Sequence, residues 1–261
     1  MKAFELLDEL KVGGTVRHET CDTFKAGNPQ TELKRVAVCM TATVDVIKKA
    51  KEWGADALIV HEPTYYDHMD VKGSDRVTAL KEKLICESGI AIFRYHDYMH
   101  ARDVDQITEG ELHFLGLTGE VEPTPHFGSY ILRGTETFSA VELAERMEKM
   151  LGIRHIRIAG SRDKKTNKIA LCFGSPAGVY EILTDESVGI VITGEACEWK
   201  LAEYARDADL LGFTKSLIVM GHIPSERDGM KLLAQRLQEK HEDIAFTYIE
   251  SEEVYTYTDE T

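Results

Sequence analysis

The sequence contains few cysteines, and none of them forms a metal-binding or redox motif. Its five cysteines are an odd number, lie far apart and include no C-x-x-C pair, so a reducing compartment fits best. No stretch approaches the roughly 20 apolar residues needed to cross a bilayer, and the N-terminal segment lacks the long apolar run of an export signal. We therefore expect a cytoplasmic protein with no membrane partner.

Basic residues are outnumbered by acidic ones. The chain has 31 Lys and Arg residues against 45 Asp and Glu residues, which gives a formal net charge of -14. Such a charge repels a nucleic-acid backbone, so nucleic acid is a poor candidate partner. A small anionic substrate is still compatible with this charge if bound divalent cations dominate the local field.

The pattern of apolar residues predicts an α/β fold. The chain has 261 residues, 43% of them hydrophobic, and is long enough for one or two packed α/β lobes. Residues 35–40 form a short apolar run, residues 44–53 carry apolar side chains at helical spacing, and residues 57–60 are typical of a buried parallel strand. These elements make one βαβ unit that ends at His61 and Glu62. A helix over 76–88 and a strand over 90–94 then lead into the segment YHDYMH.

The second half of the chain repeats this pattern. When Val36 is placed on Ile169, the apolar strands coincide and Glu62 falls on Glu195. Short apolar strands align easily by chance, but polar matches just beyond the strands favour a duplication. We predict an α/β fold built from duplicated βαβ-containing halves, 1–124 and 125–261, with a turn-rich joint at 119–125. A slightly different shift pairs the following residues: His96 with His222, and His100 with Glu226.

Three groups of potential metal ligands follow these strands. Imidazole nitrogen and carboxylate oxygen are ligands of divalent transition metals, and open α/β sheets bind ligands at the carboxyl ends of their strands. A spacing of four puts two side chains on one face of a helical turn. Each group alone is compatible with a polar surface turn or a helix start, whereas all three together favour a paired divalent-metal site. Its candidate residues are His61, Glu62, His96, His100, His222 and Glu226.

Two further features have alternative interpretations. Glu195 occupies the position that Glu62 has in the first half, so it is a candidate base or a group that supports a ligand; a surface turn is the alternative. The glycine-rich segment 174–178 could cradle a phosphate, but it lacks the Lys and Ser/Thr of the nucleotide-binding signature, so a tight turn is favoured. Cys39 and Cys172 lie within strands and are expected to be buried.

Specific motifs make the chain resemble the Nif-three-like family, also called GTP cyclohydrolase 1 type 2 homologues or dinuclear metal centre hexameric proteins. The resemblance rests on RVAVCMTATVDVIKKAKEWGADALIVHEP, on YHDYMH and on the late segment GHIPSER, in which Gly221, His222, Ser225 and Glu226 match the family's Gly-His-x-x-Ser-Glu. It covers almost the whole chain, and it implies a single Nif-three-like unit over 1–261 that commonly assembles as a ring-shaped homohexamer.

The resemblance also implies a set of ligands for two divalent ions, zinc, iron, manganese or nickel. Glu226 matches a residue able to bridge two cations, and His96 lies nearby. Glu62 stands where the family usually has an imidazole, and His100 where it has a carboxylate, so the ligand count and roughly the total charge are kept. The chain also has Trp199 where many relatives have histidine. The implied ligands are His61, Glu62, His100, His222 and Glu226.

The leading functional hypothesis is a metal-dependent hydrolase. Two cations about 3.5 to 4 Å apart activate a water and polarise a phosphoryl, amidine or carbonyl group in such enzymes, and His96 or Glu195 is the candidate proton carrier. The expected substrate is a small anionic molecule such as a nucleotide or phosphoester; GTP cyclohydrolase activity is implied only by the resemblance. The alternative is a non-catalytic metal-binding or oligomeric assembly protein, and a third interpretation is a binding module for another protein.

Overall fold

The computed structural model describes residues 1–258, which form two compact units. The first comprises Met1–Ile107 and the chain from Gly229 onward, and the second comprises Thr108–Asp228. These units differ from the predicted halves 1–124 and 125–261, because strand β11 (Ala245–Tyr248) is hydrogen-bonded in parallel to β2 (Arg35–Cys39) of the first unit. No helix in this part of the chain is both long and apolar enough to span a membrane.

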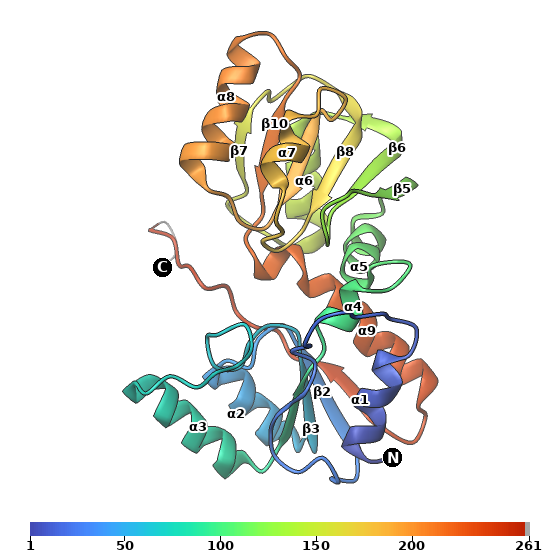
Figure 1. The fold of residues 1–261 in the computed structure, drawn as a ribbon, viewed down its shortest axis with the longest axis vertical. Coiled ribbons are helices and arrows are strands. Elements are labelled where there is room, and N and C mark those ends of the chain that lie inside the picture. The colour runs from blue at the N-terminus through green and yellow to red at the C-terminus, as the bar shows by residue number, and fades with distance from the viewer. Residues whose placement is uncertain (259–261) are drawn as a thin grey trace. The chain divides into compact units, whose positions relative to one another are not determined.

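The first unit is built around a five-stranded sheet with the order β1-β4-β3-β2-β11. Figure 1 labels its strands β2 and β3 beside helices α2 and α3. Strand β1 is antiparallel to β4, and the other four strands are parallel. Helices α2 and α3 pack together against the apolar side chains of β2 and β3. The remaining elements are β1 (Phe24–Ala26), β3 (Ala57–Val60), β4 (Ala91–Arg94), α1 (Ala3–Lys11), α2 (Val44–Trp53), α3 (Arg76–Ser88) and α9 (Arg227–Lys240).

The local sequence explains why the first βαβ unit forms where it was predicted. All four residues of β3 are buried, as a parallel strand covered on both faces requires. Helix α2 begins after Thr43, whose side chain accepts a hydrogen bond from the Val46 N–H, and ends at Gly54 in the left-handed conformation. The strand therefore delivers His61 directly from a rigid, buried element.

The second unit contains a six-stranded sheet with the order β5-β6-β8-β9-β10-β7. Its central strands β8, β9 and β10 are parallel, and the others pair antiparallel. Helix α6 begins with the predicted capping box, in which Ser139 and Glu142 exchange side-chain to backbone hydrogen bonds. The elements are α5 (Gln106–Leu115), β5 (Gly119–Pro123), β6 (Tyr130–Phe138), α6 (Ala140–Leu151), β7 (Arg157–Gly160), β8 (Thr166–Cys172), α7 (Val179–Thr184), β9 (Ile190–Thr193), π-helical η1 (Glu198–Ala202), α8 (Glu203–Leu210) and β10 (Ser216–Val219).

Both units contain the same succession of three parallel strands joined by helical segments, which confirms the predicted α/β fold with duplicated βαβ halves. The first strand pair has the same register in each unit: Val36 lies opposite Ala57, and Ile169 lies opposite Ile190. The two cysteines of these strands are fully buried, as predicted.

The third strand corrects one detail of the repeat. Ala91 lies opposite Ala57, and Ser216 lies opposite Ile190, so the counterpart of Ala91 is Ser216 rather than Leu217. The counterpart of His222 is consequently Asp97, one residue beyond His96. Apolar runs match almost equally well at neighbouring registers, whereas the pairing of strands fixes one of them.

Candidate metal centre

Three histidines come together in the first unit. His61 follows β3, and β4 leads through His96 into the single turn of helix α4 (Asp97–His100). The ring centroids are 4.6 Å apart for His61 and His96, 5.1 Å for His61 and His100, and 4.9 Å for His96 and His100. One ligand atom of each ring lies within 4.8 Å of the other two. This spacing suits the three rings to one shared cation.

A buried carboxylate starts the helical turn that carries two of these rings. Asp22 accepts hydrogen bonds from the backbone N–H groups of His96, Asp97 and Tyr98, at 2.8, 3.1 and 2.9 Å. It thereby satisfies the amides that a helix start leaves without an intrahelical partner. The His100 N–H then donates to the His96 carbonyl oxygen at 3.2 Å. The predicted turn between the two histidines therefore forms.

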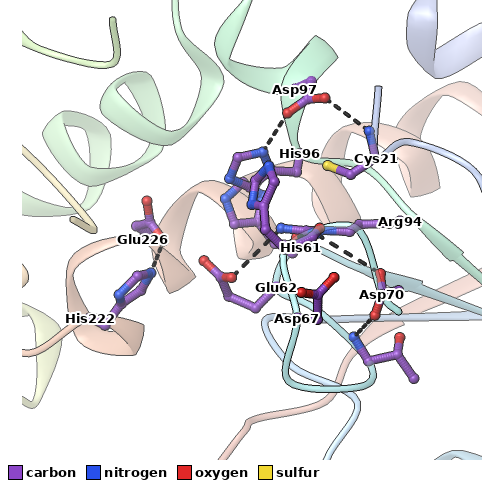
Figure 2. A network of polar contacts seen from close by, with 12 residues as sticks. Cys21, His61, Glu62, Asp67, Asp70, Arg94, His96, Asp97, His222 and Glu226 are labelled. Atoms are coloured by element: carbon purple, nitrogen blue, oxygen red, sulfur yellow. Dashed lines mark hydrogen bonds and ion pairs between the residues drawn. The ribbon is translucent and has the colours of Figure 1, made fainter. Parts of the chain in front are cut away.

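In all three rings Nδ1 contacts an oxygen atom that accepts a hydrogen bond. A carbonyl or ionised carboxylate oxygen can only accept, so Nδ1 is the donor and the lone pair of the neutral ring lies on Nε2. Metal-binding histidines usually have this second contact, which fixes the tautomer and the ring orientation. Figure 2 shows the contact between Asp97 and His96. The acceptors are the Tyr95 carbonyl for His61 (3.1 Å), Asp97 Oδ1 for His96 (2.9 Å) and Asp105 Oδ2 for His100 (2.7 Å).

Burial favours the neutral, metal-binding form of His61 and His96. Burial, followed by the neighbouring rings of His96 and His100, lowers the pKa of His61 well below its ordinary value. Burial also lowers the pKa of His96, although its hydrogen bond to Asp97 opposes the shift. Burial alone would raise the pKa of Asp97, but hydrogen bonds from His96, the Cys21 N–H and Thr20 hold it well below its usual range. Neutral imidazoles beside an ionised carboxylate suit a divalent cation.

Glu62, a predicted ligand, lies beside a buried guanidinium group. Its Oε2 is 3.7 Å from Nη2 of Arg94, whose side chain is fully buried (Figure 2). Arg94 Nε donates to the His61 carbonyl oxygen at 2.7 Å, and Nη1 lies 3.9 Å from Asp70. Arg94 and a metal ion would therefore both attract the Glu62 carboxylate, and ligation by Glu62 stays a prediction. The sequence did not indicate a role for Arg94, because a charged residue at the end of an apolar strand is common.

The second unit brings His222, Glu226 and Glu195 together. His222 and Glu226 flank the 3-10 turn η2 (Ile223–Ser225), and His222 Nε2 lies 3.2 Å from Glu226 Oε2 (Figure 2). On the other side of the ring, Nδ1 lies 2.7 Å from Glu195 Oε1. The contact between His222 Nε2 and Glu226 Oε2 can be held together either by a proton on Nε2 or by a cation that both atoms bind. Glu195, a predicted catalytic residue, orients His222.

The Gly-His-x-x-Ser-Glu motif fixes this arrangement through its serine. Ser225 Oγ accepts a hydrogen bond from the Gly174 N–H at 2.9 Å and donates to the His222 carbonyl oxygen at 2.8 Å. Gly174 has a φ of +66°, and a Cβ placed there would lie 2.3 Å from Glu226 Oε1. The glycine-rich segment after β8 therefore leaves the space that the Glu226 carboxylate occupies.

The predicted residues thus fall into two groups, one in each unit. His61, His96 and His100 meet in the first unit, and His222 and Glu226 meet in the second. His96, predicted to be a proton carrier or neighbour, is oriented in the same way as His100, so the geometry makes it a candidate ligand. The prediction that both groups serve one pair of ions bridged by Glu226 stays a prediction.

The carboxylates that orient the first group were not among the predicted site residues. Asp97 is adjacent to His96, and Asp105 follows His100 by five residues, so an acidic residue close to each histidine was the available signal. Cys21 and His68 also approach Asp97, but they come from distant loops. No spacing in the sequence indicates that contact.

Comparisons with known proteins find the same family that the sequence motifs indicated. The chain matches the family described as Duf34/NIF3 (NGG1p interacting factor 3) over residues 23–254. A Yersinia pestis protein named GTP cyclohydrolase 1 type 2 homolog is 26% identical over 220 residues, which cover 82% of this chain and 84% of the relative.

Solved structures share the fold. Protein ybgI, of unknown function, superposes with a TM-score of 0.78 at 21% identity, covering 97% of this chain and 99% of that one. A Bacillus cereus protein related to NIF3 superposes with a TM-score of 0.74 at 15% identity, covering 100% and 98%. Because residues 23–254 match the family model, and because solved structures share the mixed α/β fold, the chain belongs to the Duf34/NIF3 family.

Proposed function

We propose that this protein binds two divalent metal ions, one at each ligand group, and uses them to hydrolyse a small anionic substrate. The observation that carries the proposal is the common orientation of four histidines. In each, Nδ1 contacts an acceptor oxygen, which makes Nε2 the nitrogen for a cation; at His222 that nitrogen faces Glu226 Oε2, the second proposed ligand of its group. The four are His61, His96, His100 and His222.

The donor set fits borderline divalent ions such as zinc, iron, manganese or nickel, which accept imidazole and carboxylate ligands. When bound, such ions lower the pKa of water and polarise a phosphoryl, amidine or carbonyl group. The chain's own contribution is to hold its ligands rigidly. Asp97 and Asp105 fix two of the rings, and the space at Gly174 fixes the position of Glu226.

Glu195 has two roles in this proposal. Its Oε1 orients His222 at 2.7 Å, and its side chain is 57% exposed. A carboxylate has a second oxygen, so Glu195 can orient the imidazole through Oε1 and accept a proton from an attacking water at Oε2. His96, whose Nδ1 is bonded to Asp97, is better suited to hold a cation than to carry this proton.

The substrate class is proposed from charge and from the relatives. A chain with a net charge of -14 needs bound cations to attract an anion, and the curated relatives carry the name GTP cyclohydrolase 1 type 2 homolog. We therefore propose a nucleotide or another phosphoester. The homohexamer and the cytoplasmic location implied by the resemblance stay predictions.

Metal analysis of purified variants tests the binding step. Protein stripped by a chelator and reloaded with zinc, iron, manganese or nickel is expected to lose about one equivalent in His96→Asn and another in His222→Asn. His113→Ala is the matched control, because His113 is an exposed histidine on α5 outside both groups. Wild-type protein with less than one equivalent of every metal, or variants that load like the control, would contradict the proposal.

Turnover tests the catalytic step. We expect the reloaded protein to hydrolyse at least one compound in a panel of nucleotides and phosphoesters, and Glu195→Gln to lower kcat by about 100-fold, the usual worth of a general base. Metal binding without turnover on the whole panel would favour the non-catalytic metal-binding protein.

A further inference from the structure

A second set of metal-ligating side chains lies in the first unit, next to the histidine group. Ligand atoms of Cys21, His68 and Asp97 all lie within 4.8 Å of one another. The ring of His18 is also close, with its Nε2 3.4 Å from Asp97 Oδ2. This set supplies sulfur, nitrogen and oxygen atoms, a combination typical of four-coordinate zinc sites.

The charge around Cys21 is negative. Asp97 and Asp22 are both buried carboxylates in contact with this cysteine. The nearby cation Arg94 lies 3.7 Å from Glu62 and 3.9 Å from Asp70, so its charge is shared with these carboxylates. A divalent cation that replaced the thiol proton would offset this concentration of negative charge.

The backbone holds these residues in place. The Cys21 N–H donates to Asp97 Oδ2 at 3.0 Å (Figure 2). The Thr20 hydroxyl donates to the same oxygen at 2.9 Å, and together these bonds fix the carboxylate beside the thiol. The carbonyl oxygen of His68 accepts a hydrogen bond from the buried Arg94 guanidinium. His68 itself is exposed, and its ring lies 5.6 Å from the His96 ring. The set therefore combines a fixed buried side with an open side that solvent ions can reach.

We propose that Cys21, His68 and Asp97, with His18 as a fourth ligand, form an additional site for a thiophilic divalent cation such as zinc. On binding, the Cys21 thiol releases its proton to solvent and its sulfur bonds to the cation. Zinc ligands at about 2.0 to 2.3 Å from the ion lie roughly 3.5 Å apart. Closing the set from 4.8 Å therefore takes a movement of about 1 Å, which the exposed imidazoles of His68 and His18 can make.

Asp97 links this site to the histidine group, because its Oδ1 lies 2.9 Å from His96 Nδ1. A cation bound to the other oxygen of Asp97 would share that carboxylate with a ring of the neighbouring group. The new site otherwise uses residues that the proposed function does not need. The two proposals can therefore fail independently.

Cobalt(II) is the probe, because thiolate ligation gives a sulfur-to-cobalt charge-transfer absorption that imidazoles and carboxylates alone do not produce. Titration of the full-length, metal-free protein is expected to show this absorption, with saturation by about three equivalents because the two sites of the proposed function also take cobalt. Cys21→Ser should abolish it, and His68→Ala should raise the apparent Kd by at least ten-fold. Cys86→Ser and Cys197→Ser, which change the two exposed cysteines, are the controls and should retain the absorption.

Two results would overturn the additional site: no thiolate absorption in the wild type, or full absorption in Cys21→Ser. His68→Ala guards against loss through misfolding, because its side chain is exposed and its removal leaves the buried core intact. A His68→Ala variant that binds cobalt as tightly as wild type would also contradict the proposal. Cobalt that still binds through His96 and His222 without the thiolate absorption would leave the proposed function standing.

Discussion

Replacing Gly174 by alanine should displace the proposed metal ligand Glu226 by the addition of a single methyl group. The new Cβ would lie 2.3 Å from Glu226 Oε1, 2.8 Å from Cδ and 3.2 Å from Oε2. Non-bonded heavy atoms normally lie about 3.5 Å or more apart. The Glu226 carboxylate must therefore move away from the new Cβ by roughly 1 Å. A displacement of that size in a rigid site typically costs about 100-fold in function.

The substitution also strains the backbone, and a matched variant separates the two effects. Gly152 ends helix α6 with the same φ of +66°, and a Cβ placed there meets no heavy atom of residues 1–258 within 4 Å. Alanine in this left-handed conformation costs about 1 to 2 kcal/mol at either position. Each variant should therefore lose several degrees of Tm, since about 1 kcal/mol corresponds to roughly 2 to 4 °C in a chain of this size.

Calorimetric titration with zinc or manganese distinguishes the variants. We expect Gly174→Ala to weaken binding at the His222–Glu226 group by about 10- to 100-fold, and Gly152→Ala to bind like the wild type. Equal affinities in the two variants would refute the assignment of Glu226 as a ligand held in place by the space at Gly174.

Three further predictions follow from single contacts. Asp105→Asn should weaken metal binding about 10- to 100-fold in titration calorimetry, because it removes the acceptor that orients His100, whereas the exposed Asp103→Asn should have no effect. Because burial lowers the pKa of His96, the unfolded chain binds more protons at this residue below about pH 6.5, so His96 alone should reduce the unfolding free energy of the metal-free protein by up to about 1.4 kcal/mol per pH unit as the pH falls. In His96→Asn, the unfolding free energy from urea titrations should fall less steeply with decreasing pH than in the wild type. An unchanged pH dependence would contradict the lowered pKa of His96. Ser225→Ala should cost about 1 to 3 kcal/mol in the same assay, because the buried Gly174 N–H loses its acceptor.

The strands and helices that carry the first ligand group could be predicted because their signals are local. The four apolar residues of β3 and the helix over 76–88 have the predicted bounds, since the strand is marked by a continuous apolar run and the helix by a capping residue at each end. His61 follows from that prediction, because a residue just after a buried parallel strand lies at the sheet edge where ligands bind.

The division into units could not be predicted from local patterns. Strand β11 joins the sheet of the first unit beside β2, although about 200 residues separate them in the sequence. Parallel pairing carries no local turn signal of the kind that marks a hairpin. The register of β10 escaped prediction for a related reason, because an apolar run slides by one residue without changing its composition.

The groups that orient the ligands escaped prediction because they depend on side-chain contacts across the fold. Glu195 was found through the internal repeat, but its contact with His222 Nδ1 was not. Arg94 contacts Glu62, and Cys21 contacts Asp97, although the members of each pair lie far apart in the sequence. Residue type and spacing therefore indicated the candidate ligands more readily than the groups that hold those side chains in place.

Anomalous X-ray diffraction from crystals grown with zinc tests the central claim most directly. The account predicts zinc peaks bonded to the Nε2 atoms of His61, His96 and His100, and to Nε2 of His222, at about 2.0 to 2.1 Å, with every Nδ1 still on its oxygen acceptor. Zinc bonded through Nδ1, or no zinc peak at either histidine group, would contradict it.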